Sequence, residues 1–281
     1  MAHTVTREDF TSIGELLETL NGRPNNRFMR SEHASDKEDA SFSNCGSLQE
    51  AEDLLRYGYT EKLGKVKEET RKHSQQLYNL FKTKRLPANM PVGFVPNVPN
   101  ALQNRPDSMI TIQQTFQKKK TKHVIYVNSS NCGTSTSTFV KAGIALVTAI
   151  NLIEAAGIQT KLTNAFFSAD SHDDETTFAT LRIKDYGERF NLEKICFPMI
   201  HPAMFRRIGF KWLETCPSLK TDFSCGYGHT PDPSSREAID RIYKKDDAVI
   251  LWVNDIRDND YSTKWILDQF GFVIPDKVRM V

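Results

Sequence analysis

One short run near the carboxyl end constrains the fold more than any other stretch. Residues 248–253 read AVILWV, which is apolar and rich in strand-forming residues, without alternation between polar and apolar positions. Such a run predicts a strand that is buried on both faces, as in a parallel sheet. Residues 234–243 precede it with apolar residues at helical spacing and predict a helix. Asn254 and Asp255 follow the strand, at the edge where open α/β sheets bind ligands, although the same pair is also typical of a turn.

The middle of the chain alternates between strand and helix patterns. Residues 123–127 predict a buried strand, residues 138–156 a helix, and residues 159–167 a second strand. This order is a βαβ unit, which joins parallel strands by a right-handed crossover. We therefore expect an α/β fold of the Rossmann type, with a mostly parallel central sheet flanked by helices.

Four further elements are expected in this part of the chain. Residues 177–185 alternate as an edge strand does, and residues 272–274 are long enough only for a short edge strand. Residues 191–213 predict two helical segments, because two prolines interrupt the pattern near His201. Residues 261–270 predict a last helix.

The first 105 residues are polar and helix-prone. Residues 10–20 carry apolar side chains on one helical face, and Ser47 with Glu50 forms a capping box ahead of a helix over residues 51–57. A longer helix is expected over residues 60–84. The apolar faces of these helices are thin, so we do not expect them to fold as an independent unit.

A proline-rich segment closes this region. Residues 86–102 contain four prolines, which favour an extended chain over a helix. We expect this segment to be a linker that wraps over a neighbouring surface. The chain then divides into a helical N-terminal region with its linker, residues 1–105, and an α/β domain, residues 106–281.

Composition narrows the functional classes. The formal net charge is +2, so no excess of basic residues points to nucleic acid, although such a partner stays open. No apolar run opens the chain, and its most apolar window, residues 139–158, carries charged side chains and predicts a core helix, not a membrane span. Five cysteines without a Cys-x-x-Cys pair predict reduced thiols. We expect a cytoplasmic chain with a protein partner and no membrane contact.

Three loop segments resemble one known arrangement. Asn128-Ser129-Ser130-Asn131-Cys132 follows the first strand of the βαβ unit, Gly228-His229-Thr230-Pro231 precedes a helix, and Asn254-Asp255 follows a strand. Over residues 122–274 the chain resembles a von Willebrand factor A domain, whose metal-ion-dependent adhesion site has Asp-x-Ser-x-Ser, a Thr and an Asp at these places. The first segment departs from that pattern, because it has Asn in place of the Asp and Cys in place of the second Ser.

The resemblance implies a partner-binding site at Asn128, Ser130, Thr230 and Asp255. Ser130, Thr230 and Asp255 would be ligands of Mg²⁺ or Mn²⁺, which are hard cations that bind carboxylate, hydroxyl and carbonyl oxygens. The thiol of Cys132 is a poor ligand for such cations. In the metal-free alternative, the hydroxyls of Ser130 and Thr230 satisfy backbone groups of their own loops.

The chain as a whole also resembles a group of phage-encoded proteins. This likeness rests on residues 50–55 (EAEDLL), Gly58-Tyr59, residues 106–109 (PDSM) and residues 201–204 (HPAM). It implies a location in the host cytoplasm.

Two functions agree with these patterns. The first is a non-enzymatic interaction module that docks a protein partner at the site above, with or without a cation. It is favoured because the matched loops belong to a binding architecture and no nucleophile–base pair stands out. The second is a metal-dependent hydrolase or nuclease using Asp170, Asp173, Asp255 and Asp258, which requires these carboxylates to converge within a few ångströms.

A third arrangement is a zinc site. Cys216, Cys225 and His229 have a zinc-like order, but their spacing is looser than the Cys-x₂₋₄-Cys hooks of structural zinc sites.

Overall fold

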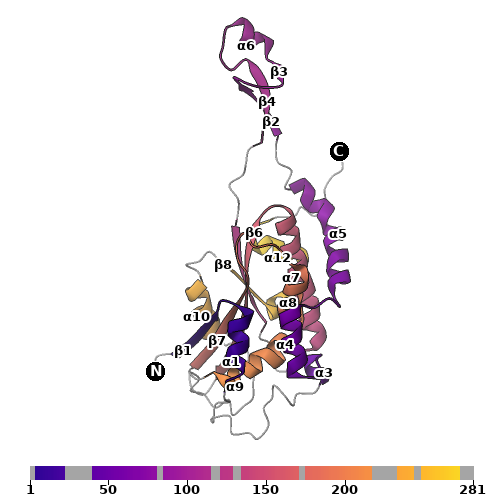
Figure 1. The fold of residues 1–281 in the computed structure, drawn as a ribbon, viewed down its shortest axis with the longest axis vertical. Coiled ribbons are helices and arrows are strands. Elements are labelled where there is room, and N and C mark those ends of the chain that lie inside the picture. The colour runs from indigo at the N-terminus through magenta and orange to yellow at the C-terminus, as the bar shows by residue number, and fades with distance from the viewer. Residues whose placement is uncertain are drawn as a thin grey trace.

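A computed structural model describes residues 4–22, 40–80, 85–114, 121–128, 134–170, 175–216, 233–243 and 248–272. The main sheet has five strands in the order β1-β7-β6-β5-β8 (Figure 1). The β6–β7 pair is antiparallel and the other three pairs are parallel, so the expected α/β fold with a mostly parallel sheet flanked by helices is confirmed. The strands are β1 (Thr4–Phe10), β5 (Thr121–Val127), β6 (Gln159–Asp170), β7 (Glu175–Lys184) and β8 (Ala248–Trp252).

The expected βαβ unit is present as β5, α7 (Thr136–Ala155) and β6. In the register of β5, Val124 pairs with Leu162 of β6 and with Val249 of β8. Successive residues of β5 point to opposite faces, so Val124 belongs to the larger hydrophobic cluster and Ile125 to the smaller one. Because both faces are covered, the strand needs no polar alternation.

Helices cover the two faces unequally. The smaller cluster is closed by α10 (Pro233–Tyr243) through Ile239 and Tyr243. The larger cluster packs one face against most of the remaining helices, as the ribbon in Figure 1 illustrates: α1 (Ile13–Leu20), α4 (Leu48–Tyr57), α5 (Leu63–Leu80), α7, α8 (Leu192–Ile200), α9 (Phe210–Thr215), α11 (Val253–Asp258) and α12 (Thr263–Gln269). A short helix, α3 (Ala40–Ser43), and the π-helix η1 (Met204–Gly209) complete the body.

The N-terminal strand corrects two expectations. The helix predicted over residues 10–20 begins only at Ile13, and Ser12 caps it by accepting the Glu15 N–H. Residues 4–10 instead form β1, which pairs in parallel with β7. β7 is therefore an inner strand and not the predicted edge strand. Phe10 fits the helical spacing of the residues after it, which is why local periodicity favoured the longer helix.

The N-terminal helices belong to the common core. Leu16 of α1, Leu55 of α4 and Val66 of α5 are completely buried in the same cluster as α7. The predicted cap of α4 is confirmed, since the Ser47 side chain accepts the Glu50 N–H. Residues on both sides of the expected boundary at residue 105 thus share one core.

The proline-rich segment is not the extended linker that its composition favoured. Residues 85–114, called the small sheet below, contain the antiparallel strands β2 (Arg85–Met90), β4 (Met109–Gln114) and β3 (Val95–Pro96) in that order, and the helix α6 (Val98–Leu102). α6 tolerates Pro99 because a proline in the first turn gives up no helical hydrogen bond. Gly93 is required at its position, since a Cβ there would lie 2.4 Å from the Ile110 carbonyl oxygen. Figure 1 shows the small sheet beyond one end of the body.

The remaining expectations concern the C-terminal half. The predicted break near His201 is confirmed, because α8 ends at Ile200 and His201 has extended backbone angles before η1 begins. The helices α10 and α12 are present, although α12 begins at Thr263. β8 is an outer strand of the described sheet, and only its last two residues are fully buried, which corrects the expectation of burial on both faces. The strand predicted over residues 272–274 falls largely outside the described residues.

The helices α5, α8, α11 and α12 pack against α7. It is the one helix of the described residues that is long and apolar enough to cross a membrane by composition, and here most of it is buried in the body. Gly143 lies where α7 approaches α8 most closely, since a Cβ there would lie 2.3 Å from the Met199 carbonyl oxygen.

We expect Gly143→Ala to destabilise the protein by about 1–3 kcal/mol, because the added methyl group would force two buried helices apart. Gly64→Ala in α5 is the matched control, since a Cβ at Gly64 meets nothing within 4 Å. That change should be neutral or stabilising by up to about 1 kcal/mol. Urea unfolding of both variants measures the difference, and equal midpoints would contradict the close approach.

Candidate functional site at the carboxyl edge of the sheet

β5 and β8 end side by side at one edge of the main sheet. Val127 pairs with Trp252, so Asn128 and Asn254 follow neighbouring strands at the same edge. The loop from β5 returns to this edge at Thr134, two residues before α7 begins. Together with Asp255, the side chains of Asn128, Thr134 and Asn254 form what we call the rim. Asn128, Thr134 and Asn254 are buried, although all three are polar.

The rim contains buried oxygens without partners. Asn128 Oδ1, Thr134 Oγ1 and Asn254 Oδ1 have no hydrogen-bond partner within the described part of the chain. A buried polar atom left in this state costs about 1–3 kcal/mol, and native structures hold few of them. Other buried oxygens, such as those of Thr148 and Asn164, share this state, so what distinguishes the three rim oxygens is that they lie at one edge of the sheet.

Asp255 is tied to the opposite face of the sheet through Arg236 of α10. Both terminal nitrogens of Arg236 lie 3.1 Å from Asp255 Oδ1, and the guanidinium stacks 4.5 Å from the centre of the Trp252 ring. Both side chains of the ion pair are 34% exposed. A pair exposed to this degree contributes only about 0–1 kcal/mol. Arg236 therefore neutralises the charge of Asp255 in an ion pair that is weak enough to open.

The charges of Arg236 and Asp255 also affect the pKa of a neighbouring carboxyl group, that of Asp240. Burial raises the pKa of Asp240 in α10, the positive charge of Arg236 opposes the rise, and the negative charge of Asp255 adds to it. The polar groups near the rim thus include a carboxyl group that is harder to ionise than usual.

The predicted site is only partly within the described residues. Asn128 and Asp255 lie at one edge as expected, whereas Ser130, Thr230 and Cys132 fall outside the described residues. The oxygen donors that are described suit a hard cation in kind. They include one carboxylate, already paired with Arg236, so a second carboxylate would be needed for firm binding of Mg²⁺ or Mn²⁺.

The four aspartates of the hydrolase hypothesis are not all placed. Asp258 Oδ1 accepts a 2.8 Å hydrogen bond from Arg257 on an exposed surface. Asp170 is the last residue of β6, its side chain lies outside what the structure describes, and Asp173 lies outside the described residues. Within the described ranges, no three His, Cys, Asp or Glu side chains gather as a metal site would require.

The described cysteines are buried free thiols. Cys216, one member of the zinc hypothesis, donates to Glu8 Oε1 at 3.2 Å, while Cys225 and His229 lie outside the described residues. Burial raises the pKa of Cys45 to about 11 and that of Cys196 to about 12. These two thiols are therefore poor nucleophiles at neutral pH.

Sequence reasoning missed Arg206, which holds the backbone at Thr134 in place. Its guanidinium lies between the rings of Phe42 and Phe139, 3.9 and 4.8 Å from their centres. It donates hydrogen bonds to the carbonyl oxygens of Phe42 and Thr134. The backbone at Thr134 is thus fixed by a buried cation from η1. The signal in the sequence was a pair of arginines within an otherwise apolar helical stretch.

Arg207 fastens the segment that precedes α4. Its Nε donates to Ser43 Oγ, and its Nη2 donates to the Cys45 carbonyl oxygen, both at 3.1 Å. The two arginines occupy a π-helix, a rare conformation that is frequent at functional sites.

The side chain of His201 takes part in the break between α8 and η1. Its Nδ1 accepts the Ala203 N–H, and its ring stacks on Phe197 at 5.2 Å. Burial lowers the pKa of His201 to about 4, although Glu61 and Glu50 oppose the shift. The imidazole is therefore neutral at physiological pH because it is buried.

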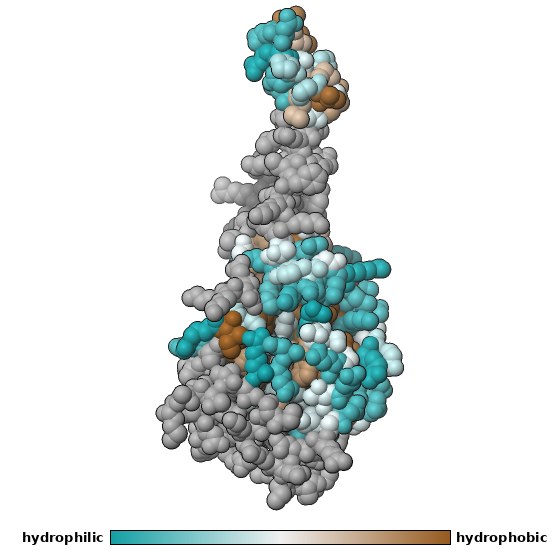
Figure 2. All heavy atoms as spheres, turned by 60° about the vertical axis from the view of Figure 1, so that its left-hand side comes forward, coloured by the Kyte–Doolittle hydropathy of each residue, from teal (hydrophilic) through white to brown (hydrophobic). Residues whose placement is uncertain are grey.

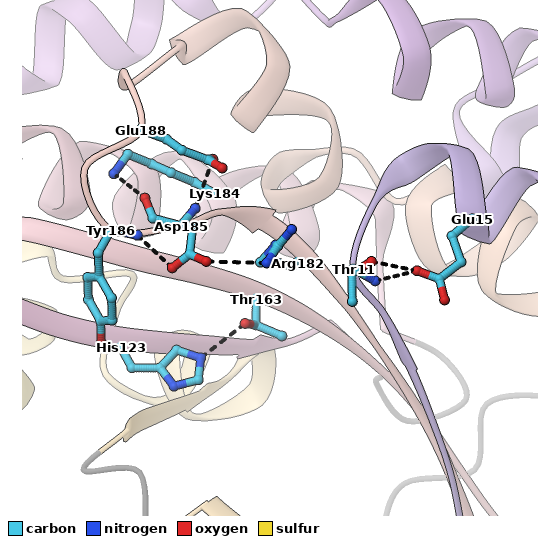
Figure 3. A network of polar contacts seen from close by, with 9 residues as sticks. All are labelled: Thr11, Glu15, His123, Thr163, Arg182, Lys184, Asp185, Tyr186 and Glu188. Carbon is cyan, nitrogen blue, oxygen red and sulfur yellow. Dashed lines mark hydrogen bonds and ion pairs between the residues drawn. The ribbon is translucent and has the colours of Figure 1, made fainter.

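The opposite edge of the sheet is satisfied by its own side chains. Figure 3 shows the Asp185 carboxylate accepting from Arg182 and from the Tyr186 N–H, at 3.2 and 2.7 Å. In the same view, His123 bonds to Thr163 at 3.0 Å. The contrast between this closed network and the open oxygens identifies the carboxyl edge as the candidate site.

We expect Arg206→Met to destabilise the protein strongly, because each lost charge-assisted hydrogen bond contributes about 1.5–3 kcal/mol. Arg71→Met on the exposed surface of α5 is the control and should stay within about 0.5 kcal/mol of the unmodified protein. Unfolding free energies from urea titrations give both values. A loss below 0.5 kcal/mol for Arg206→Met would show that this cation does not fix the backbone at Thr134.

The comparisons with known proteins identify a family. The family described as "Domain of unknown function (DUF7192)" matches residues 2–272, so the chain belongs to it. No curated protein and no solved structure matches the chain.

Proposed function

We propose that this member of the DUF7192 family is a non-catalytic interaction module that docks a protein partner at the rim. The observation that carries the proposal is the set of three buried oxygens at Asn128, Thr134 and Asn254 that lack partners in the described part of the chain. Amide oxygens accept hydrogen bonds and bind cations, so the docked group supplies donors or positive charge.

The group that fits best is a Mg²⁺ or Mn²⁺ ion bridging to a carboxylate of the partner. The rim offers neutral oxygens and the carboxylate of Asp255, and both are ligands of hard cations. The resemblance to an adhesion site adds Ser130 and Thr230 to this set. The partner's carboxylate would supply the second negative charge that the rim lacks, and this requirement couples cation binding to docking.

Opening the Arg236–Asp255 pair is not an obstacle to this mechanism. An ion pair that is about one-third exposed contributes about 0–1 kcal/mol, which is small beside the interaction of a carboxylate with a divalent cation. Arg236 can keep its stacking contact with Trp252 when Asp255 turns to the cation. The arginine then remains at the rim as a further contact for the partner's carboxylate.

Support for a non-catalytic function comes from the state of the described side chains. The Cys45 and Cys196 thiols are buried with raised pKa values, and His201 uses its Nδ1 lone pair within the helix break. The two described aspartates of the hydrolase hypothesis, Asp255 and Asp258, are each paired with an arginine.

The test is Mn²⁺ binding with acetate as the probe for the partner's carboxylate. Electron paramagnetic resonance of free Mn²⁺ should show tighter binding to the full chain when acetate is present. Asp255→Ala should abolish this binding and alter stability by no more than about 1 kcal/mol. Asp258→Ala is the control, because that carboxylate lies on the same helix but outside the rim.

Two results would overturn the proposal. The first is the absence of Mn²⁺ binding with and without acetate. The second is binding that survives Asp255→Ala, which would place the cation elsewhere.

A further inference from the structure

The small sheet carries most of the large hydrophobic side chains that are exposed in the described chain. Of nine large hydrophobic side chains that are exposed, six lie in it, and the most exposed are Val92 and Leu102, each at 82%. We call these six the apolar patch: Met90, Val92, Phe94, Val95, Val98 and Leu102. Figure 2 shows brown surface on the small sheet at the tip of the molecule. Exposed apolar side chains gathered in one element of the fold are typical of an interaction site.

The patch is almost free of charge. Residues 89–111 include two charged residues, Arg105 and Asp107, and these form an ion pair at 3.3 Å. The chain as a whole is 26% charged, so the small sheet is depleted of charge relative to the rest. Depletion of charge together with aromatic and Met side chains is typical of the centre of protein–protein interfaces.

The small sheet has no core of its own among its described side chains. None of residues 89–111 is buried. A sheet of three short strands needs a hydrophobic face that is covered by another element, because without one it is only marginally stable. Its apolar side chains would gain that cover by association.

We infer that the apolar patch docks against the same patch of a second copy of this chain. Two identical surfaces without net charge meet without electrostatic repulsion, and each covers apolar area of the other. A partner with a charged docking face would find no counter-charge here beyond the Arg105–Asp107 pair, which is already closed. An anionic lipid surface would likewise find no excess of basic side chains.

The contact is made by side chains and not by strand pairing. β2 and β3 are the outer strands of the small sheet, and each contains a proline, Pro87 or Pro96, that has no backbone N–H to offer to a further strand. Prolines at such positions prevent a further strand from adding to the sheet. The position of the small sheet beyond one end of the body leaves room for two patches to meet (Figure 1). This dimer is independent of the rim and would carry two rims.

The test is the oligomeric state of the full chain, measured by sedimentation velocity over a wide range of protein concentrations. We expect a reversible monomer–dimer equilibrium. Phe94→Asp should weaken dimerisation about tenfold or more, because it places a charge in the apolar contact. Val92→Asp should do the same, and its side chain is so exposed in the monomer that folding is not at risk.

Tyr57→Asp is the control, since Tyr57 is 74% exposed on α4 outside the patch and its substitution should leave the dimer unchanged. A wild-type chain that stays monomeric at every concentration overturns the inference. So does a dimer that both patch variants leave intact. Flotation of a monomeric wild-type chain with phosphatidylcholine vesicles would overturn it in favour of a lipid surface.

Discussion

The fold depends on the burial of β5 between two parallel strands and two helical layers. Val124, Ile125, Tyr126 and Val127 are completely or almost completely buried, with alternate residues in different hydrophobic clusters. Burying a side chain of this size contributes about 1.5–3 kcal/mol, so four in succession anchor the sheet. The position of β5 fixes where α7 begins and where β8 ends, and it therefore brings Asn128, Thr134 and Asn254 to one edge. The same constraint that makes the core thus gathers polar atoms at an edge where the described residues supply them no hydrogen-bond partner.

The sequence predicts those strands and helices that are determined by residues close together in the chain. The strand over residues 123–127, the helix that follows it and the break at His201 were all predicted, because apolar periodicity and proline positions act within a few residues. β1 was missed since Phe10 fits a helical face as well as a strand, and only its pairing with β7 decides between the two. The small sheet was missed because prolines favour an extended linker over residues 86–102. The outer strands β2 and β3 nevertheless accommodate Pro87 and Pro96, and α6 accommodates Pro99 in its first turn.

For the candidate site, the sequence predicted the residues that follow the strands but not the side chains that contact them. Asn128 and Asp255 were expected at the carboxyl edge, since parallel strands align their carboxyl ends. The partners of the rim were not predicted, because Arg236 reaches Asp255 from a helix that covers the other face of the sheet, and Arg206 reaches Thr134 from a π-helix 72 residues away. Contacts of this kind depend on how helices pack, and no spacing within one segment reports them. Ser130 and Thr230 remain predictions from the sequence.

The most direct measurement is the unfolding free energy of variants that remove the rim amides. Asn128→Leu and Asn254→Leu replace oxygens that lack partners in the described chain, so each should leave stability unchanged or raise it by up to about 1–3 kcal/mol. Asn164→Leu is the matched comparison: the Oδ1 of this buried amide likewise has no partner among the described residues, but its Nδ2 donates to the Pro198 carbonyl oxygen at 2.6 Å. It should lose about 1–3 kcal/mol, because that carbonyl would be left unpaired. If Asn128→Leu and Asn254→Leu lose as much as Asn164→Leu, the rim oxygens already serve the fold, and the account of a site held open for a ligand is contradicted.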